Sequence, residues 1–158
     1  MKSPLMKNWW LALLAPLFMQ NVCSKESDNP DVQLPNADQY VTWTTSAVNG
    51  SLTVPTDSLD FYHMGNNTAF YGMTKPNRTI YFELSFDGPQ QNGNYTATNF
   101  VVVAGGKHYY PSSTPVQINV TTYSGSGQYV IGTYSGNVLD SATSAVVPVS
   151  GAFRIKND

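Results

Sequence analysis

The chain has 158 residues, 8 of them basic and 10 acidic, which gives a formal net charge of −2. This length predicts one main domain with a core of its own, and the absence of a basic patch argues against a nucleic-acid partner. Charged residues make up only 11% of the chain, while Ser, Thr, Asn, Gly and Tyr are abundant. That balance is typical of exported β proteins and unlike the surface of many cytosolic helical domains.

Residues 1–22 have the pattern of a signal peptide. Lys2 and Lys7 precede an apolar run at residues 9–19. A run of about eleven residues is too short for a bilayer span of roughly 20 residues. A cleaved secretory signal is therefore the prediction, and a transmembrane anchor is the weaker alternative.

Cys23 is the only cysteine and directly follows this segment, before the polar stretch at residues 24–28. A cysteine at the cleavage point resembles bacterial lipoproteins, in which the thiol receives a diacylglyceryl group and becomes the first residue of the mature chain. Residues 20–22, Gln-Asn-Val, differ from the usual lipobox, whereas the stretch Ser-Lys-Glu-Ser-Asp after the cysteine resembles the surface-export signal of Bacteroidetes lipoproteins. The resemblance implies a fatty-acylated, palmitate-type anchor at Cys23 and a place in the cell envelope, on either side of the outer membrane. The alternative is an ordinary secretory signal cut nearby, with Cys23 incidental.

Residues 23–38 are polar, contain two prolines and show no apolar period, which predicts a flexible tether. From residue 39 to residue 158 the chain alternates short β-branched and aromatic segments with Gly, Asn, Asp and Pro clusters. This pattern predicts a single β domain with strands at 40–46, 51–54, 68–73, 79–86, 95–103, 107–110, 116–121, 129–134 and 147–156.

The side-chain alternation in three of these segments predicts a sheet with one buried face. The inward residues are expected to be Ile80, Phe82, Leu84 and Phe86, then Val116, Ile118 and Val120, and finally Val147, Val149, Gly151, Phe153 and Ile155. Because Pro148 has no amide hydrogen for a ladder, the last strand is expected at an edge or bent at this point. Residues 87–93 and Gly105-Gly106 are predicted hairpin loops.

Eight or nine short strands of this kind predict an antiparallel β-sandwich. A small closed β-barrel is the alternative, because Gly132 and Gly151 fall within strands and would allow the tight bends of a closed sheet.

Catalytic chemistry has little support in the sequence. Asp60, His63 and His108 form the sharpest hypothesis for a metal site, and the stretch around Asp60 and His63 is loop-like, without a recognised ligand spacing. A calcium site at Asp87-Gly88 would have only one acid. No Gly-x-Ser-x-Gly segment occurs, and no second acid is placed beside Glu83 for glycoside hydrolysis. We therefore expect no catalytic site, no metal and no cofactor.

Aromatic residues are the better lead to function, with 10 tyrosines and 3 tryptophans in the chain. Rings exposed on a rigid sheet can stack on sugars or fill a protein interface. Trp43, Tyr81, Tyr109 and Tyr110 are the candidate binding residues. The alternative is that the tyrosines stabilise the sheet through cross-strand contacts and that Trp43 belongs to the core.

Two short segments, Asp57-Ser58-Leu59 and Asp140-Ser141-Ala142, resemble the Asp-Ser/Thr-apolar motif that Bacteroidetes use for O-glycosylation, which marks Ser58 and Ser141. With its anchor, its size and its strand pattern, the whole chain resembles the small β-rich lipoproteins that Bacteroidetes export. The resemblance implies a non-enzymatic envelope lipoprotein that binds glycan, or a structural or adhesive partner of a surface protein complex. A hydrolase or a metal-binding protein is the most distant alternative.

Overall fold

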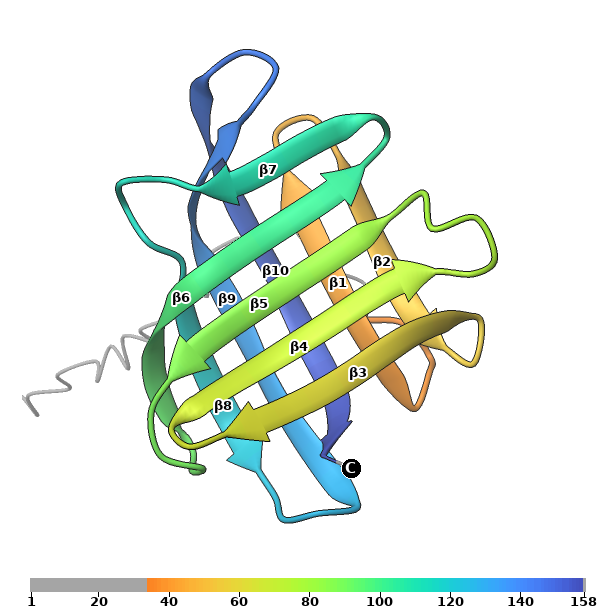
Figure 1. Cartoon of the computed structure of the whole chain (residues 1–158), viewed down its shortest axis with the longest axis vertical. Coiled ribbons are helices and arrows are strands. Elements are labelled where there is room, and N and C mark those ends of the chain that lie inside the picture. Colours follow the sequence, from red (N-terminus) through yellow and green to blue (C-terminus); the bar gives the residue numbers. More distant parts are fainter. Residues whose placement is uncertain (1–33, 158) are drawn as a thin grey trace, which may run out of the picture. The chain divides into compact units, whose positions relative to one another are not determined.

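Ten antiparallel strands form one continuous sheet in the computed structural model, which describes residues 34–157 (Figure 1). Neighbours along the sheet follow the order β2-β1-β10-β9-β7-β6-β5-β4-β3, and β8 pairs with both β6 and β9. The strands are β1 Gln39–Thr45, β2 Asn49–Val54, β3 Asp57–Met64, β4 Asn67–Thr74, β5 Tyr81–Asp87, β6 Gly93–Ala104, β7 Lys107–Pro111, β8 Gln117–Tyr123, β9 Gln128–Asp140 and β10 Ala145–Asn157. Cys23 and the predicted signal peptide lie outside the described residues.

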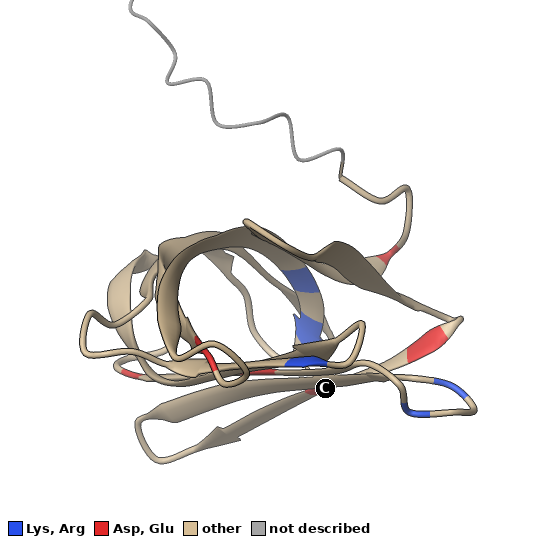
Figure 2. Cartoon of the chain, turned by 90° about the horizontal axis from the view of Figure 1, so that it is seen from above, with Lys and Arg blue, Asp and Glu red and all other residues tan. Residues whose placement is uncertain are grey.

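The sheet folds over itself into two layers. Strands β3 to β7 cross in front of β1, β2, β9 and β10 in Figure 1, and Figure 2 shows from above how the sheet curves around the core. The long strands β6 and β9 form the corner, because β7 joins them at one end and β8 at the other. The predicted all-β antiparallel fold is confirmed. It has the two layers of the expected sandwich, and the ladders of β6, β7, β9 and β8 form a small closed ring like that of the barrel alternative.

Aromatic rings from both layers fill the space between them. Phe82 of β5 contacts Trp43 of β1 and Tyr134 of β9, with ring centroids 6.3 Å and 6.0 Å away. Phe70 of β4 packs on Phe153 of β10 at 4.8 Å. All five rings are at most 2% exposed, so burial of these large aromatic side chains contributes strongly to stability.

The predicted inward faces of the three clearest strands are largely confirmed. Phe82, Leu84 and Phe86 are buried, as are the three residues predicted for β8 and all but Val147 of those predicted for β10. The two-residue loop between β6 and β7 is also confirmed. Gly105 and Gly106 both have positive φ, at 58° and 74°, as a tight hairpin with the sheet's twist requires.

The structure corrects two predictions. Residues 57–64 form strand β3 instead of a loop, because Leu59 and Phe61 point inward and Phe61 packs on Phe70 at 5.7 Å. This strand brings the number to ten. Strand β10 is central, not at an edge, and its ladder with β1 ends at Val149. Pro148 lies just beyond that last pair, so its missing amide hydrogen interrupts no β1 bond.

A buried polar contact joins β9 to β1 across β10. The Tyr134 hydroxyl donates a hydrogen bond to the Thr42 carbonyl oxygen at 2.6 Å, passing over Gly151. A Cβ on Gly151 would overlap both of these oxygens. The Thr42 hydroxyl replaces part of the β1–β10 ladder, since it accepts from the Ala152 amide at 3.0 Å and donates to the Ala152 carbonyl at 3.3 Å. Gly151 within β10 therefore allows the close approach of Tyr134 to β1. From the sequence, this glycine was expected to allow a tight bend of the sheet.

We predict that Tyr134→Phe lowers the free energy of unfolding by about 1–3 kcal/mol, because it removes the buried donor to the Thr42 carbonyl while keeping the ring. Gly151→Ala should cost at least as much, because the new methyl group has no room. Urea unfolding would measure both, with Tyr110→Phe on the surface as the control. A Tyr134→Phe protein as stable as the wild type would contradict this account of the contact.

Candidate functional site

The outward face of the front layer carries a line of three tyrosines. The register pairs Tyr71 of β4 with Asp60 of β3 and with Glu83 of β5. Tyr62 lies two residues along β3 from Asp60, and Tyr81 lies two residues along β5 from Glu83. Because residues two apart in a strand point to the same face, Tyr62, Tyr71 and Tyr81 run obliquely across three neighbouring strands. We call these three residues the tyrosine diagonal.

The tyrosine diagonal is accessible and regularly spaced. Tyr62 is 49% exposed, and Tyr71 and Tyr81 are partly exposed. Each tyrosine is one strand across and two residues along from the next, a diagonal relation that separates backbone positions by about 7–8 Å. The spacing suits an elongated ligand that crosses the strands.

Glu83 is held in a fixed position beside Tyr81. Its Oε2 accepts a hydrogen bond from the Tyr81 hydroxyl at 2.6 Å, and its Oε1 accepts one from the Asn99 side-chain amide, also at 2.6 Å. Burial raises the pKa of Tyr81 well above its usual range, and the hydrogen bond to Glu83 with that residue's negative charge raises it further. The Tyr81 phenol thus stays protonated and donates to the carboxylate.

Asp60 provides a second carboxylate on the other side of Tyr71. Its Oδ2 accepts a hydrogen bond from the Ser58 hydroxyl at 3.1 Å. Two strand spacings, roughly 10 Å, separate its backbone from that of Glu83. Strands β3 to β6 contain no Lys or Arg. Figure 2 shows that charged residues of either sign are sparse over the whole sheet. The strands that carry the tyrosine diagonal therefore have acidic side chains and no Lys or Arg, and two basic residues, Lys75 and Arg78, lie in the turn that precedes Tyr81.

Of the four aromatic residues predicted to form a binding surface, two are accessible and two are buried. Tyr81 belongs to the tyrosine diagonal, and Tyr110 is 39% exposed on β7, where its hydroxyl lies 3.2 Å from His108 Nδ1. Trp43 and Tyr109 are buried, at 1% and 0% exposure, so their assignment to an exposed binding surface is wrong. Both point into the space between the layers, where large rings are stabilised by packing.

Two members of the tyrosine diagonal, Tyr62 and Tyr71, were not among the predicted site residues. Each flanks an inward phenylalanine, Phe61 or Phe70. Alternation along β4 was available from the sequence and predicts that Tyr71 faces outward. Its alignment with Tyr62 and Tyr81 depends on the register between strands, which single-strand patterns do not give.

The suggested metal site does not form. Asp60 and His63 lie in β3, whereas His108 lies in β7, with β4, β5 and β6 between them. The Nδ1 atom of His63 is 2.9 Å from the Thr68 hydroxyl. Within residues 34–157, no group of three or more His, Cys, Asp or Glu side chains is arranged to hold a metal ion.

The two serines of the O-glycosylation motifs differ in accessibility. Ser58 is partly buried in β3 and donates its hydroxyl hydrogen to Asp60. Ser141 is exposed in the turn after β9, and its backbone amide donates to the His108 carbonyl at 3.0 Å. Of the two, Ser141 has the more accessible hydroxyl.

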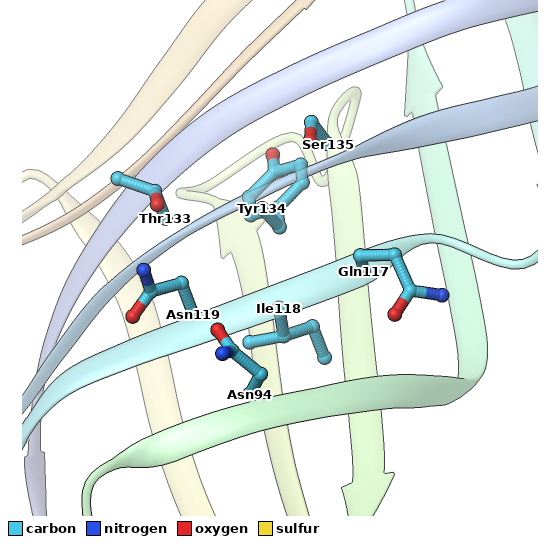
Figure 3. Close-up of a pocket in the computed structure, with 7 residues that line it drawn as sticks. All are labelled: Asn94, Gln117, Ile118, Asn119, Thr133, Tyr134 and Ser135. Atoms are coloured by element: carbon cyan, nitrogen blue, oxygen red, sulfur yellow. The ribbon is translucent and has the colours of Figure 1, made fainter.

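A shallow groove of about 340 Å³ lies elsewhere, over β8 and its neighbours β6 and β9 (Figure 3). Its polar lining consists of three amide and two hydroxyl side chains, from Asn94, Gln117, Asn119, Thr133 and Ser135. The one aromatic residue in the lining is Tyr134, which is 2% exposed. This groove can form hydrogen bonds but presents no ring for stacking.

No protein-family model, curated protein or solved structure matches this chain. In the part of the chain from residue 34 to residue 157, no helix has the length and apolar character needed to cross a membrane.

The contact between Tyr81 and Glu83 predicts how the phenol titrates. Glu83→Gln should lower the pKa of Tyr81 toward its usual value, because it removes the negative charge beside the hydroxyl. It should not restore that value fully, because burial is the larger cause of the shift. Ultraviolet-monitored alkaline titration, with Tyr81→Phe to identify the signal, would measure the change. A pKa of Tyr81 that is the same with and without the Glu83 charge would contradict the contact.

Proposed function

We propose that the protein is a non-enzymatic lipoprotein of the cell envelope that binds glycans through the tyrosine diagonal. The observation that carries the proposal is the alignment of Tyr62, Tyr71 and Tyr81 on one outward face. Aromatic rings offer apolar faces on which the C–H faces of sugars can stack. The Tyr81 and Tyr62 hydroxyls already donate hydrogen bonds to Glu83 and Met64, and their oxygens keep lone pairs that can accept from a sugar hydroxyl.

Polar groups beside the rings support the same function. The Asn99 side-chain amide donates a hydrogen bond to Glu83 at 2.6 Å. Asp60 lies on the other side of Tyr71 from Glu83. Acceptors and donors fixed in this way suit the vicinal hydroxyls of a sugar, because they lose little conformational freedom on binding. The groove over β8 is less favoured as the main site because its polar side chains have no exposed ring among them.

The geometry favours binding over catalysis. Both oxygens of Glu83 accept hydrogen bonds from neighbouring side chains, and Tyr71 stands between Glu83 and Asp60. Two carboxyl groups of a glycosidase must face each other across one scissile bond. A hydrolase therefore stays the distant alternative.

A lipid on Cys23 would place this domain at the membrane surface. Residues 23–38 would act as a polar tether between the acylated end and β1, which begins at Gln39. The tyrosine diagonal would then be available to polymers outside the bilayer.

A protein partner is the second candidate, supported by the edge strand β3. This strand ends the sheet order and pairs only with β4 among the described strands. It exposes Met64 at 67% and Tyr62 at 49%. Exposed apolar side chains on an unpaired edge are typical of protein contacts. Met64→Lys should weaken such a contact, because it replaces an exposed apolar side chain of the edge strand by a charged one.

We expect Tyr71→Ala to weaken glycan binding roughly five- to tenfold, since one stacked ring contributes about 1 kcal/mol or slightly more. Affinity electrophoresis through gels containing a panel of soluble polysaccharides would measure retardation. Tyr110→Ala and Thr133→Ala are matched controls, because they remove exposed side chains away from the tyrosine diagonal. If Tyr71→Ala and the wild type are retarded equally by every polysaccharide that binds, the proposed site is wrong.

The anchor has its own test. Cys23→Ser should move the full-length protein from the membrane fraction to the soluble fraction, because serine lacks the thiol that carries the lipid. Fractionation with labelled fatty acid would measure both location and acylation. A Cys23→Ser protein that stays with the membranes would contradict the anchor.

A further inference from the structure

We infer that the tyrosine diagonal selects glycans by charge and that its preferred ligands carry free amino groups. This inference rests on the proposed glycan-binding function and adds the chemical class of the ligand. Neutral chains should bind more weakly than amino-sugar chains, and acidic chains more weakly still.

The first support is the position of two carboxylates in one row with Tyr71. Asp60 is the cross-strand partner of Tyr71 on β3, and Glu83 is its partner on β5. Each backbone position is therefore one strand spacing, about 5 Å, from that of Tyr71. A sugar stacked on the Tyr71 ring would have a negative charge on both sides.

The second support is the unused bonding capacity of these carboxylates. An ionised carboxylate has about four acceptor sites. Glu83 uses one on each oxygen, for Tyr81 and Asn99, and Asp60 uses one, for Ser58. Acceptor sites therefore remain for a ligand ammonium group, which would also interact favourably with the face of Tyr71.

The third support is the absence of Lys and Arg from the strands on both sides of Tyr71. Strands β3 to β6 contain no Lys or Arg, and Lys75 and Arg78 lie in the turn between β4 and β5. Lys107, the first residue of β7, is 3.4 Å from the Asp140 carboxylate. His63 is held by Thr68 at 2.9 Å, on the inward side of β3. An acidic sugar over Tyr71 would meet repulsion from Asp60 and Glu83 with no basic partner on these strands.

The experiment compares oligosaccharides of equal length and linkage. A β-1,4-linked glucosamine oligomer carries free amines, its fully N-acetylated form is neutral, and an oligouronate is acidic. Isothermal titration calorimetry at slightly acidic pH, where the amines are protonated, should give roughly tenfold tighter binding of the amine form than of the acetylated form. Raising the salt concentration should reduce this preference, because both carboxylates are near solvent.

Three variants separate the contributions. Asp60→Asn and Glu83→Gln should each reduce the preference for the amine form, and the double variant should abolish it while neutral oligomers still bind. Asp87→Asn is the matched control. It removes one negative charge at the end of β5, where Asp87 accepts a hydrogen bond from Asn67 at 2.9 Å, away from the tyrosine diagonal.

The outcomes distinguish this inference from the proposed function. Binding that depends on Tyr71 but is equal for the amine and acetylated forms would overturn the inference and leave the proposed function standing. An equal loss of preference in Asp87→Asn would also overturn it, because net charge alone would then explain the effect. If the wild type binds none of these oligomers nor any polysaccharide of the wider panel, both proposals fail.

Discussion

The contact of Tyr134 with Thr42 holds three strands of the back layer in one arrangement. The hydroxyl on β9 reaches the carbonyl on β1 over β10, which is possible because Gly151 has no side chain. The Tyr134 ring also touches Phe82 and Phe100 of the front layer, at 6.0 Å and 5.3 Å between centroids. One side chain therefore satisfies a buried carbonyl in one layer and packs against the other. A buried polar contact of this kind is sensitive to small displacements, because an unpaired carbonyl in the core is costly.

The outward tyrosines follow from this core. Phe70 and Phe82 point inward against rings of the back layer, so their neighbours Tyr71, Tyr81 and Glu83 must point outward. The candidate site is thus built on strands whose opposite face packs against the core, completely in β4 and β5 and partly in β3. Such a surface is rigid, which favours binding because little ordering is needed when a ligand arrives.

The sequence predicted the fold class and the most regular faces, and the reasons for its failures are local. Alternation in β5 and β8 was clear because apolar residues occupy every second position. Strand β3 was missed because Asp57, Ser58 and Asp60 are disfavoured in strands, and its place is decided by packing of Leu59 and Phe61 on distant residues. Tyr109 and Tyr110 are adjacent, so alternation requires one to be buried but does not say which. The candidate site depends on cross-strand pairings such as that of Asp60 with Tyr71. These pairings join separate segments of the chain, so the residue pattern of one segment does not predict them.

Because the tyrosine diagonal crosses three strands, any ligand that binds it requires these strands to be paired in the correct register. A slip of one residue between β4 and its neighbours would turn Tyr71 inward and Phe70 outward, so the mispaired sheet would lose its ligand surface and its core together. A ligand that binds only the correctly paired sheet stabilises it in proportion to the logarithm of the ligand concentration. A glycan bound across β3, β4 and β5 would therefore stabilise the pairing of these strands at the free edge of the sheet. The free energy of unfolding of the domain would then be highest where the ligand is abundant.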